Sequence, residues 1–91
     1  MTNEKVLLQF LNKRAGHTPM RNILNGVYFY KGCTLKSNGL ELINYNTRLA
    51  YWEKDILHIN LKKYSSTTSH IQSKLTKLAK ESDIPYIEEY N

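Results

Sequence analysis

Cysteine, proline and glycine are all scarce in this sequence of 91 residues, which contains one cysteine, two prolines and four glycines. Because Cys33 stands alone, no disulfide can form within the chain, and a single thiol fits a reducing compartment. The longest apolar runs have only three or four residues, which is too short to cross a membrane. The first residues lack the small-residue cleavage site of a secretory signal. The sequence therefore predicts a soluble cytoplasmic protein.

Motifs for catalysis and for metal binding are also absent. The chain contains no phosphate-binding glycine loop, no Gly-x-Ser-x-Gly sequence and no paired cysteines. His17, His58 and His70 lie far apart and have no acidic residues at ligand spacing. Glu53 and Asp55 belong to a polar turn, where acidic side chains are usually solvated. We therefore expect no enzymatic activity, no cofactor and no metal ion.

Acidic residues are scarce over most of the chain and are gathered at its end. Residues 1–80 hold all 13 lysines and arginines but only four acids, a balance of +9. Residues 81–91 hold four acids and no base, a balance of −4. A basic body is typical of proteins that bind polyanions such as nucleic acid. The acidic segment can fold against that body, contact a partner or be solvated, and the division we predict is a domain of residues 1–81 with an acidic tail of residues 82–91.

Hydrophobic periodicity predicts a helix near each end of the chain. Residues 3–14 have apolar side chains at helical spacing, with Thr2 available as the N-cap and Gly16 as the stop. A last helix is expected to begin at Ser69, because Ser69 and Gln72 have the spacing of a capping box. The apolar stripe of that helix is expected to comprise Ile71, Leu75, Leu78 and Ala79. Its opposite side is expected to carry His70, Lys74, Lys77 and Lys80.

The middle of the chain has the alternation and turn signals of short strands. Asn-Gly pairs at 25–26 and 38–39 bound a strand over residues 27–36. Further strands are expected within residues 40–46, 47–53 and 56–64. The predicted fold class is α+β, with a small antiparallel sheet of three or four strands flanked by the N-terminal and C-terminal helices. Both helices are expected on one face of the sheet, which leaves the other face wet.

Five consecutive hydroxyl residues connect the last expected strand to the last helix. Capping and turn chemistry account for one or two of them. The alternative is an anion site, because a helix N-terminus presents unpaired N–H groups to which hydroxyls add donors and lysines add charge. In this region and along the last helix, the candidate nucleic-acid-binding residues are Lys62, Lys63, Tyr64, Ser65, Thr67, Thr68, Ser69, Lys74 and Lys77.

Aromatic residues are numerous, with seven tyrosines, one tryptophan and two phenylalanines. Several lie in expected strands beside basic residues, notably Tyr45 and Tyr51 near Arg48. Side chains that point outward from a sheet in this company can stack on unpaired bases while the cations hold phosphates. The alternative is that these tyrosines form ordinary cross-strand pairs.

Two stretches resemble a known group of proteins. The strings LINYNTRLAY at 42–51 and ILHINLKKYSSTTSHIQSKL at 56–75 are similar to a short domain in small proteins of bacteriophages and mobile genetic elements of low-GC Gram-positive bacteria, staphylococci included. The shared elements are a Tyr-Asn-Thr strand and a Tyr-Ser-x-Thr-Thr-Ser motif. The chain is also similar in size to the small partner of the replication polymerase of staphylococcal cassette elements, which is associated with single-stranded DNA. The resemblance, over residues 40–78, implies a genomic context and carries over no site.

Two hypotheses of function follow. The first is a nucleic-acid-binding accessory protein of a mobile element or phage that acts in replication, with single-stranded DNA favoured. The second is a protein-interaction module, such as a phage-type inhibitor of a host system or a polymerase-docking subunit, which uses the acidic tail with its Tyr86, Ile87 and Tyr90. The second predicts that deletion of residues 82–91 abolishes partner binding and leaves the fold intact.

Overall fold

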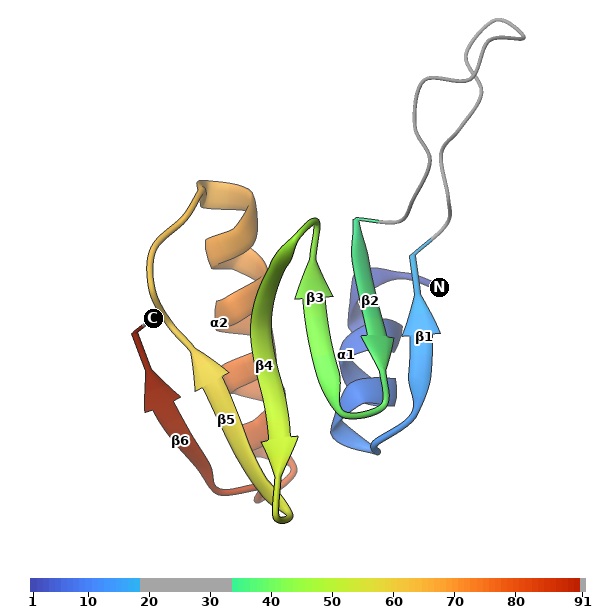
Figure 1. The fold of residues 1–91 in the computed structure, drawn as a ribbon, viewed down its shortest axis with the longest axis vertical. Coiled ribbons are helices and arrows are strands. Elements are labelled where there is room, and N and C mark those ends of the chain that lie inside the picture. Colours follow the sequence, from blue (N-terminus) through green and yellow to red (C-terminus); the bar gives the residue numbers. More distant parts are fainter. Residues whose placement is uncertain (19–33, 91) are drawn as a thin grey trace, which may run out of the picture.

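A computed structural model gives the fold and describes residues 1–18 and 34–90. In this part of the chain, two helices cover one face of a six-stranded sheet (Figure 1). The helices are α1 (Asn3–Leu11) and α2 (Ser66–Glu81). The strands are β1 (Ala15–His17), β2 (Leu35–Asn38), β3 (Glu41–Asn44), β4 (Thr47–Glu53), β5 (Ile56–Asn60) and β6 (Tyr86–Glu89). Neither of these helices is long and apolar enough to span a membrane.

The strands follow one another across the sheet in chain order. Neighbours from β1 to β5 are antiparallel, whereas β6 pairs in parallel with β5 after the chain has passed through α2. The predicted α+β class is confirmed. The prediction of three or four strands is too low, because it omits β1 and β6. The prediction of an antiparallel sheet is also corrected: the sheet is mixed, because β6 pairs in parallel with β5.

Several features of the sequence lie among residues that the structure leaves undescribed. Most of the strand expected over residues 27–36 lies there, and only its end overlaps β2. The Asn-Gly turn at 25–26 and the environment of Cys33 also lie outside the described residues. By contrast, the second Asn-Gly turn joins β2 to β3, and the side-chain oxygen of Asn38 accepts hydrogen bonds from the backbone N–H groups of Leu40 and Glu41.

The core lies between the two helices and the sheet. On α1 the buried residues are Val6, Leu7, Phe10 and Leu11, as the helical spacing predicts. On α2 they include the whole predicted stripe, Ile71, Leu75, Leu78 and Ala79. The sheet contributes Leu35, Leu42, Leu49, Ala50, Leu57 and Ile59. Each fully buried leucine contributes about 1.5–3 kcal/mol relative to an exposed one, so this cluster is the main source of stability.

A bulge in β4 determines which of its side chains reach the open face of the sheet. Across the β3–β4 pair, Leu42 is opposite Ala50 but Ile43 is opposite Arg48, so Leu49 is an extra residue. Both Leu49 and Ala50 are buried. A bulge of this kind breaks the alternation of side chains along a strand. Arg48 and Tyr51 consequently lie on the same face although they are three positions apart.

The start of α2 differs from the predicted capping box. The N-cap is Ser65, whose hydroxyl accepts a hydrogen bond from the backbone N–H of Thr68 at 3.2 Å. Gln72 does not reach back to Ser69, because its side-chain amide donates to the carbonyl oxygens of Asn60 (2.8 Å) and Lys62 (2.9 Å). The capping-box prediction is therefore wrong by one turn. A run of hydroxyl residues offers several possible caps, and contacts distant in the sequence decide among them.

Residues 82–91 include a strand of the sheet. After α2 ends, the backbone N–H of Ile84 donates to the carbonyl of Ala79, and Tyr86 packs against the core. Parallel pairing with β5 follows, and it ends where the N–H of Leu61 donates to the carbonyl of Glu89 at 2.6 Å. The predicted boundary at residue 81 therefore separates β6 from the sheet to which it belongs. Deletion of residues 82–91 would remove an edge strand, so we no longer expect such a deletion to leave the fold intact.

The position of the cap gives a test of this fold. We expect Ser65→Ala to lower the free energy of unfolding by about 1 kcal/mol, because the substitution removes the N-cap acceptor of α2. The matched variant Ser69→Ala lies within the first turns of the helix and should change stability by less than about 0.5 kcal/mol. Urea unfolding followed by circular dichroism measures both. The assignment fails if Ser69→Ala is the more costly of the two.

Candidate nucleic-acid interface

The structure separates the predicted nucleic-acid-binding residues into different regions. Arg48 and Tyr51 lie on the open face of the sheet. Lys62, Lys63 and Tyr64 belong to the connection between β5 and α2, and the hydroxyl run forms the cap and first turn of α2. Lys74 and Lys77 follow on the exposed side of α2. These regions differ in charge and in how many of their side chains form hydrogen bonds or ion pairs within the protein.

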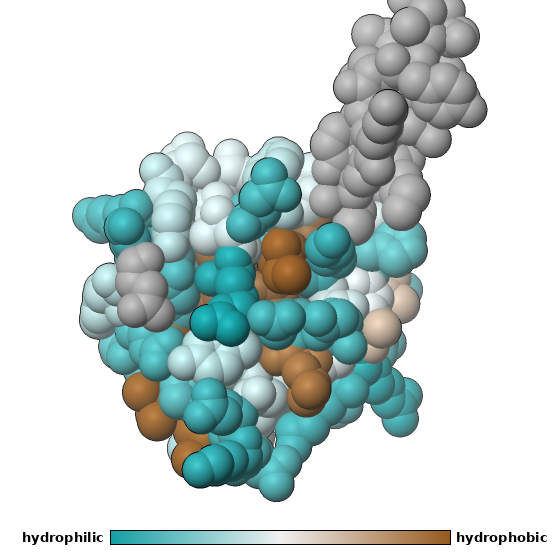
Figure 2. All heavy atoms as spheres, viewed as in Figure 1, coloured by the Kyte–Doolittle hydropathy of each residue, from teal (hydrophilic) through white to brown (hydrophobic). Residues whose placement is uncertain are grey.

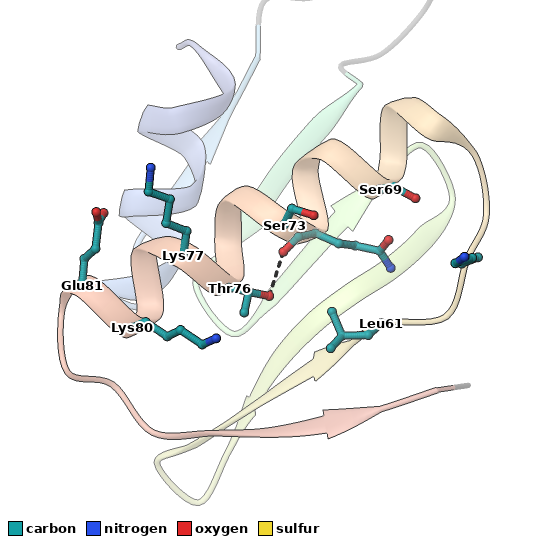
Figure 3. Close-up of a pocket in the computed structure, with 9 residues that line it drawn as sticks. Leu61, Ser69, Ser73, Thr76, Lys77, Lys80 and Glu81 are labelled. Carbon is teal, nitrogen blue, oxygen red and sulfur yellow. Dashed lines mark hydrogen bonds between the residues drawn. The ribbon is translucent and has the colours of Figure 1, made fainter.

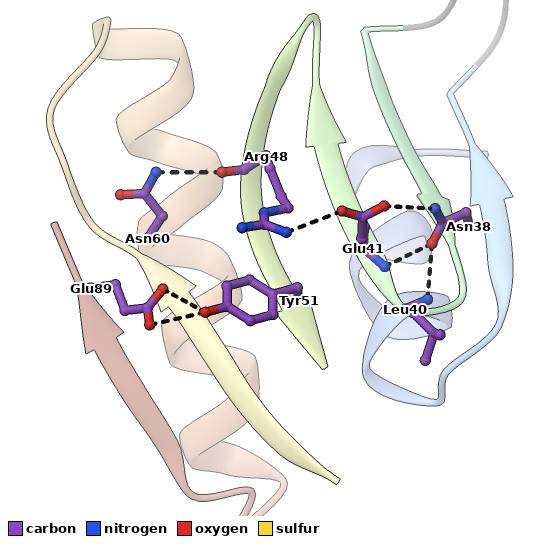
Figure 4. Close-up of polar contacts among 7 residues, drawn as sticks. All are labelled: Asn38, Leu40, Glu41, Arg48, Tyr51, Asn60 and Glu89. Atoms are coloured by element: carbon purple, nitrogen blue, oxygen red, sulfur yellow. Dashed lines mark hydrogen bonds and ion pairs between the residues drawn. The ribbon is translucent and has the colours of Figure 1, made fainter. Parts of the chain in front are cut away.

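On the open face, a network of side chains joins β4, β5 and β6. The rings of Tyr51 and His58 stack with centroids 4.5 Å apart, and the guanidinium of Arg48 lies 4.2 Å from the Tyr51 centroid. The Tyr51 hydroxyl is 3.0 Å from each carboxylate oxygen of Glu89 (Figure 4). His58 Nδ1 lies 3.1 Å from the same carboxylate. Arg48 also pairs with Glu41 at 3.3 Å.

This network makes the open face a mixed surface. Figure 2 shows hydrophilic residues over most of that face with hydrophobic groups among them. Burial raises the pKa of the Tyr51 phenol, and the hydrogen bond to Glu89 raises this pKa further. The ring contacts His58 and Arg48, so the geometry gives little support to base stacking by Tyr51.

A groove of about 590 Å³ runs beside α2 on the other side of the molecule (Figure 3). Its lining residues come from α2 and from the segment that follows β5. They are Leu61, Lys63, Ser69, Gln72, Ser73, Thr76, Lys77, Lys80 and Glu81. The set contains three lysines, three hydroxyls and a single acid. Cations and hydroxyl donors around one hollow are suited to an anion.

The wall of the groove is held by hydrogen bonds, whereas its lysines extend into solvent. The Gln72 amide ties the β5–α2 connection to the helix through its bonds to Asn60 and Lys62. Thr76 donates to the Gln72 carbonyl at 2.9 Å (Figure 3). Among the described residues, no ion pair engages the three groove lysines, and all three are exposed.

Lys74 and Thr67 lie elsewhere. They line a second hollow of about 480 Å³ between the first turns of α1 and α2. There the Lys74 ammonium is 3.7 Å from the carboxylate of Glu4. The structure therefore does not bring Lys74 into the groove with Lys77, although both lie on the exposed side of α2.

Two exposed tyrosine rings lie near the start of α2. Tyr64 is 43% exposed; its hydroxyl accepts a hydrogen bond from the Asn60 side chain at 2.8 Å, and the Lys62 ammonium is 5.8 Å from its ring centroid. Tyr45 is 56% exposed and occupies the β3–β4 turn with a positive φ of 55°. A buried hydrogen bond from Thr68 to Asn44 holds this turn beside α2. The tyrosines and the hydroxyl run thus share one end of the molecule.

The sequence identified part of the groove. Of the predicted residues, Lys63, Ser69 and Lys77 line it, whereas Ser65 caps the helix and Thr68 is buried. Sequence reasoning did not assign Ser73, Thr76 and Lys80 to a site. The missed signal was a second helical stripe: residues 69, 73, 76, 77 and 80 recur at the spacing that places side chains on one side of a helix.

No protein-family model, no curated protein and no solved structure matches the chain. The resemblance of residues 40–78 to proteins of phages and mobile elements therefore stays a prediction. So do the expectations that the protein is not an enzyme and that it uses neither a cofactor nor a metal ion.

The raised pKa of Tyr51 can be observed directly. In an alkaline absorbance titration, we expect Tyr51 to ionise above the ordinary tyrosine pKa of about 10, and Tyr51→Phe should remove its contribution to the high-pH part of the curve. A raised pKa also means that the contribution of Tyr51 to stability is present below the ordinary tyrosine pKa and is lost as the pH rises through the raised one. The matched variant Tyr90→Phe should still show the ionisation at high pH. If Tyr51→Phe also still shows this ionisation, the raised pKa does not belong to Tyr51.

Proposed function

We propose that the protein binds nucleic acid and that the phosphate backbone lies along the α2 groove. The observation that carries the proposal is the group of three lysines, Lys63, Lys77 and Lys80, around one groove that also presents hydroxyl donors. Lysine ammonium groups act as point charges toward phosphates, and serine and threonine hydroxyls donate to phosphate oxygens. Such contacts position a nucleic acid without reading its sequence.

Single-stranded DNA is the favoured ligand because of the exposed tyrosine rings at the start of α2. Tyr45 and Tyr64 lie near the start of α2, as do the groove residues Lys63 and Ser69. Unpaired bases can stack on such rings while cations hold the backbone, whereas the bases of a duplex are stacked on one another. The role as a replication accessory of a mobile element or phage comes from the resemblance of residues 40–78 alone.

The alternative of a protein-interaction module draws on the edge of the sheet near β6. Ile56 and Ile87 are exposed there to 45% and 46%, and Tyr90 is 70% exposed. Apolar side chains beside an unpaired strand edge are features of surfaces that bind an extended peptide. Both functions can coexist, because this edge and the three lysines use different residues.

Charge removal at the groove tests the main proposal. We expect Lys77→Gln/Lys80→Gln to weaken binding of a labelled oligothymidine about tenfold at low salt, since two phosphate contacts are lost. The slope of log affinity against log salt should fall by about 0.7 for each contact. The matched variant Lys5→Gln/Lys36→Gln removes the same charge from α1 and β2, outside the groove. Fluorescence anisotropy measures all three proteins, and equal weakening in both variants would place the binding site elsewhere.

The preference for single strands has its own test. We expect Tyr45→Leu/Tyr64→Leu to weaken binding of the oligothymidine about tenfold, in line with the loss of stacking on one or more bases. Binding to a duplex of the same length should change little. Tyr90→Leu removes an exposed tyrosine that follows β6 and serves as the control. Parallel losses for single strand and duplex would contradict a stacking role.

A further inference from the structure

One border of the α2 groove is acidic. Glu81 lines the groove beside Lys77 and Lys80. The strand β6 borders it as well, because the N–H of the groove residue Leu61 donates to the carbonyl of Glu89. In Figure 3, β6 runs along the side of α2 from which Lys80 projects toward Leu61. The most acidic segment of the chain is thus adjacent to groove lysines that form no ion pair in the described part of the chain.

The two neighbouring glutamates of β6 point to opposite faces of the sheet. Glu88 is paired with Ile59, whose side chain is buried beneath the helices, and residues paired across neighbouring strands share a face. Glu88 therefore lies on the helix face, where the groove is, and it is exposed. Glu89 lies on the open face, where its carboxylate binds Tyr51 and His58.

These contacts hold the acidic strand in place. Glu89 anchors β6 to β4 and β5 through side chains, the backbone pairs with β5, and Tyr86 packs against the core. The backbone of β6 is consequently fixed, and it places Glu88 on the same face of the sheet as the groove rather than in a mobile tail.

We propose that β6 is a built-in electrostatic competitor that lowers the affinity of the α2 groove for polyanions. This inference rests on the proposed function. A carboxylate held near a bound phosphate repels it, and through water the repulsion over about 10 Å amounts to roughly a twofold change in affinity. Glu81, which lines the groove itself, adds a second negative charge. Because salt screens exposed charges, the competition is strongest at low ionic strength.

Neutralising Glu88 tests the proposal. We expect Glu88→Gln to tighten binding of the labelled oligothymidine about twofold at low salt, with the gain shrinking as salt rises. Glu81→Gln should act in the same direction. The matched control Glu53→Gln removes the same charge from the far end of β4 and should have a smaller effect. Inorganic polyphosphate, which has no bases, can be used as an unlabelled competitor that displaces the oligothymidine. Its affinities for the variants should rank in the same order as those of the oligothymidine.

The outcomes separate the two proposals. If the wild type binds and Glu88→Gln behaves like Glu53→Gln, the competitor role of β6 is overturned while groove binding stands. If no variant and no wild-type protein binds either probe at low salt, the proposed function fails and the inference fails with it. Circular dichroism of each variant confirms that a change in affinity does not come from loss of the fold.

Discussion

The buried hydrogen bond between Thr68 and Asn44 fixes how α2 is seated on the sheet. Thr68 Oγ1 donates to Asn44 Oδ1 at 2.8 Å, and the Asn44 amide donates in turn to the carbonyl of Thr34 at 2.8 Å. A buried polar chain of this kind is costly unless every member is satisfied, so it tolerates one register. The apolar stripe of α2 alone permits small rotations and slides of the helix. With the first turn held at Asn44 and the next turn held by Gln72, the lysine-bearing side must lie over the segment that follows β5.

The two exposed surfaces of the domain differ in how far their basic and aromatic side chains are engaged by acids. On the open face, Glu41 pairs with Arg48, and Glu89 contacts both Tyr51 and His58. The charged and aromatic side chains of this face therefore already have partners within the protein. The three lysines of the groove have one acid beside them and form no ion pair among the described residues. Part of the positive excess that the sequence shows over residues 1–80 therefore lies beside α2 without an ion pair in the described part of the chain.

Local signals predicted the elements that form by local rules. Helical spacing located both helices and their buried sides, and alternation with turn residues located β3, β4 and β5. β1 has only three residues, at a position where glycine indicates a helix stop. β6 becomes a strand through pairing with β5 across an intervening helix, and no local pattern encodes such pairing. The site was predicted only in part. The positive charge of Lys63 and Lys77 identified them as candidates, but the rotation of α2 decides that Lys77 lines the groove while Lys74 does not.

The parallel pairing of β6 changes the meaning of the acidic end of the chain. Considered along the sequence, residues 81–91 are a charge cluster separate from the basic body. In the fold, β5, α2 and β6 form one strand–helix–strand unit, and the groove lies within it. The lysines and the acids that oppose them therefore share one folded unit, and the net charge near the groove depends on whether β6 stays paired. Tyr51 and His58 on the open face bind Glu89, so side chains on one face of the sheet stabilise the strand that shapes the field on the other.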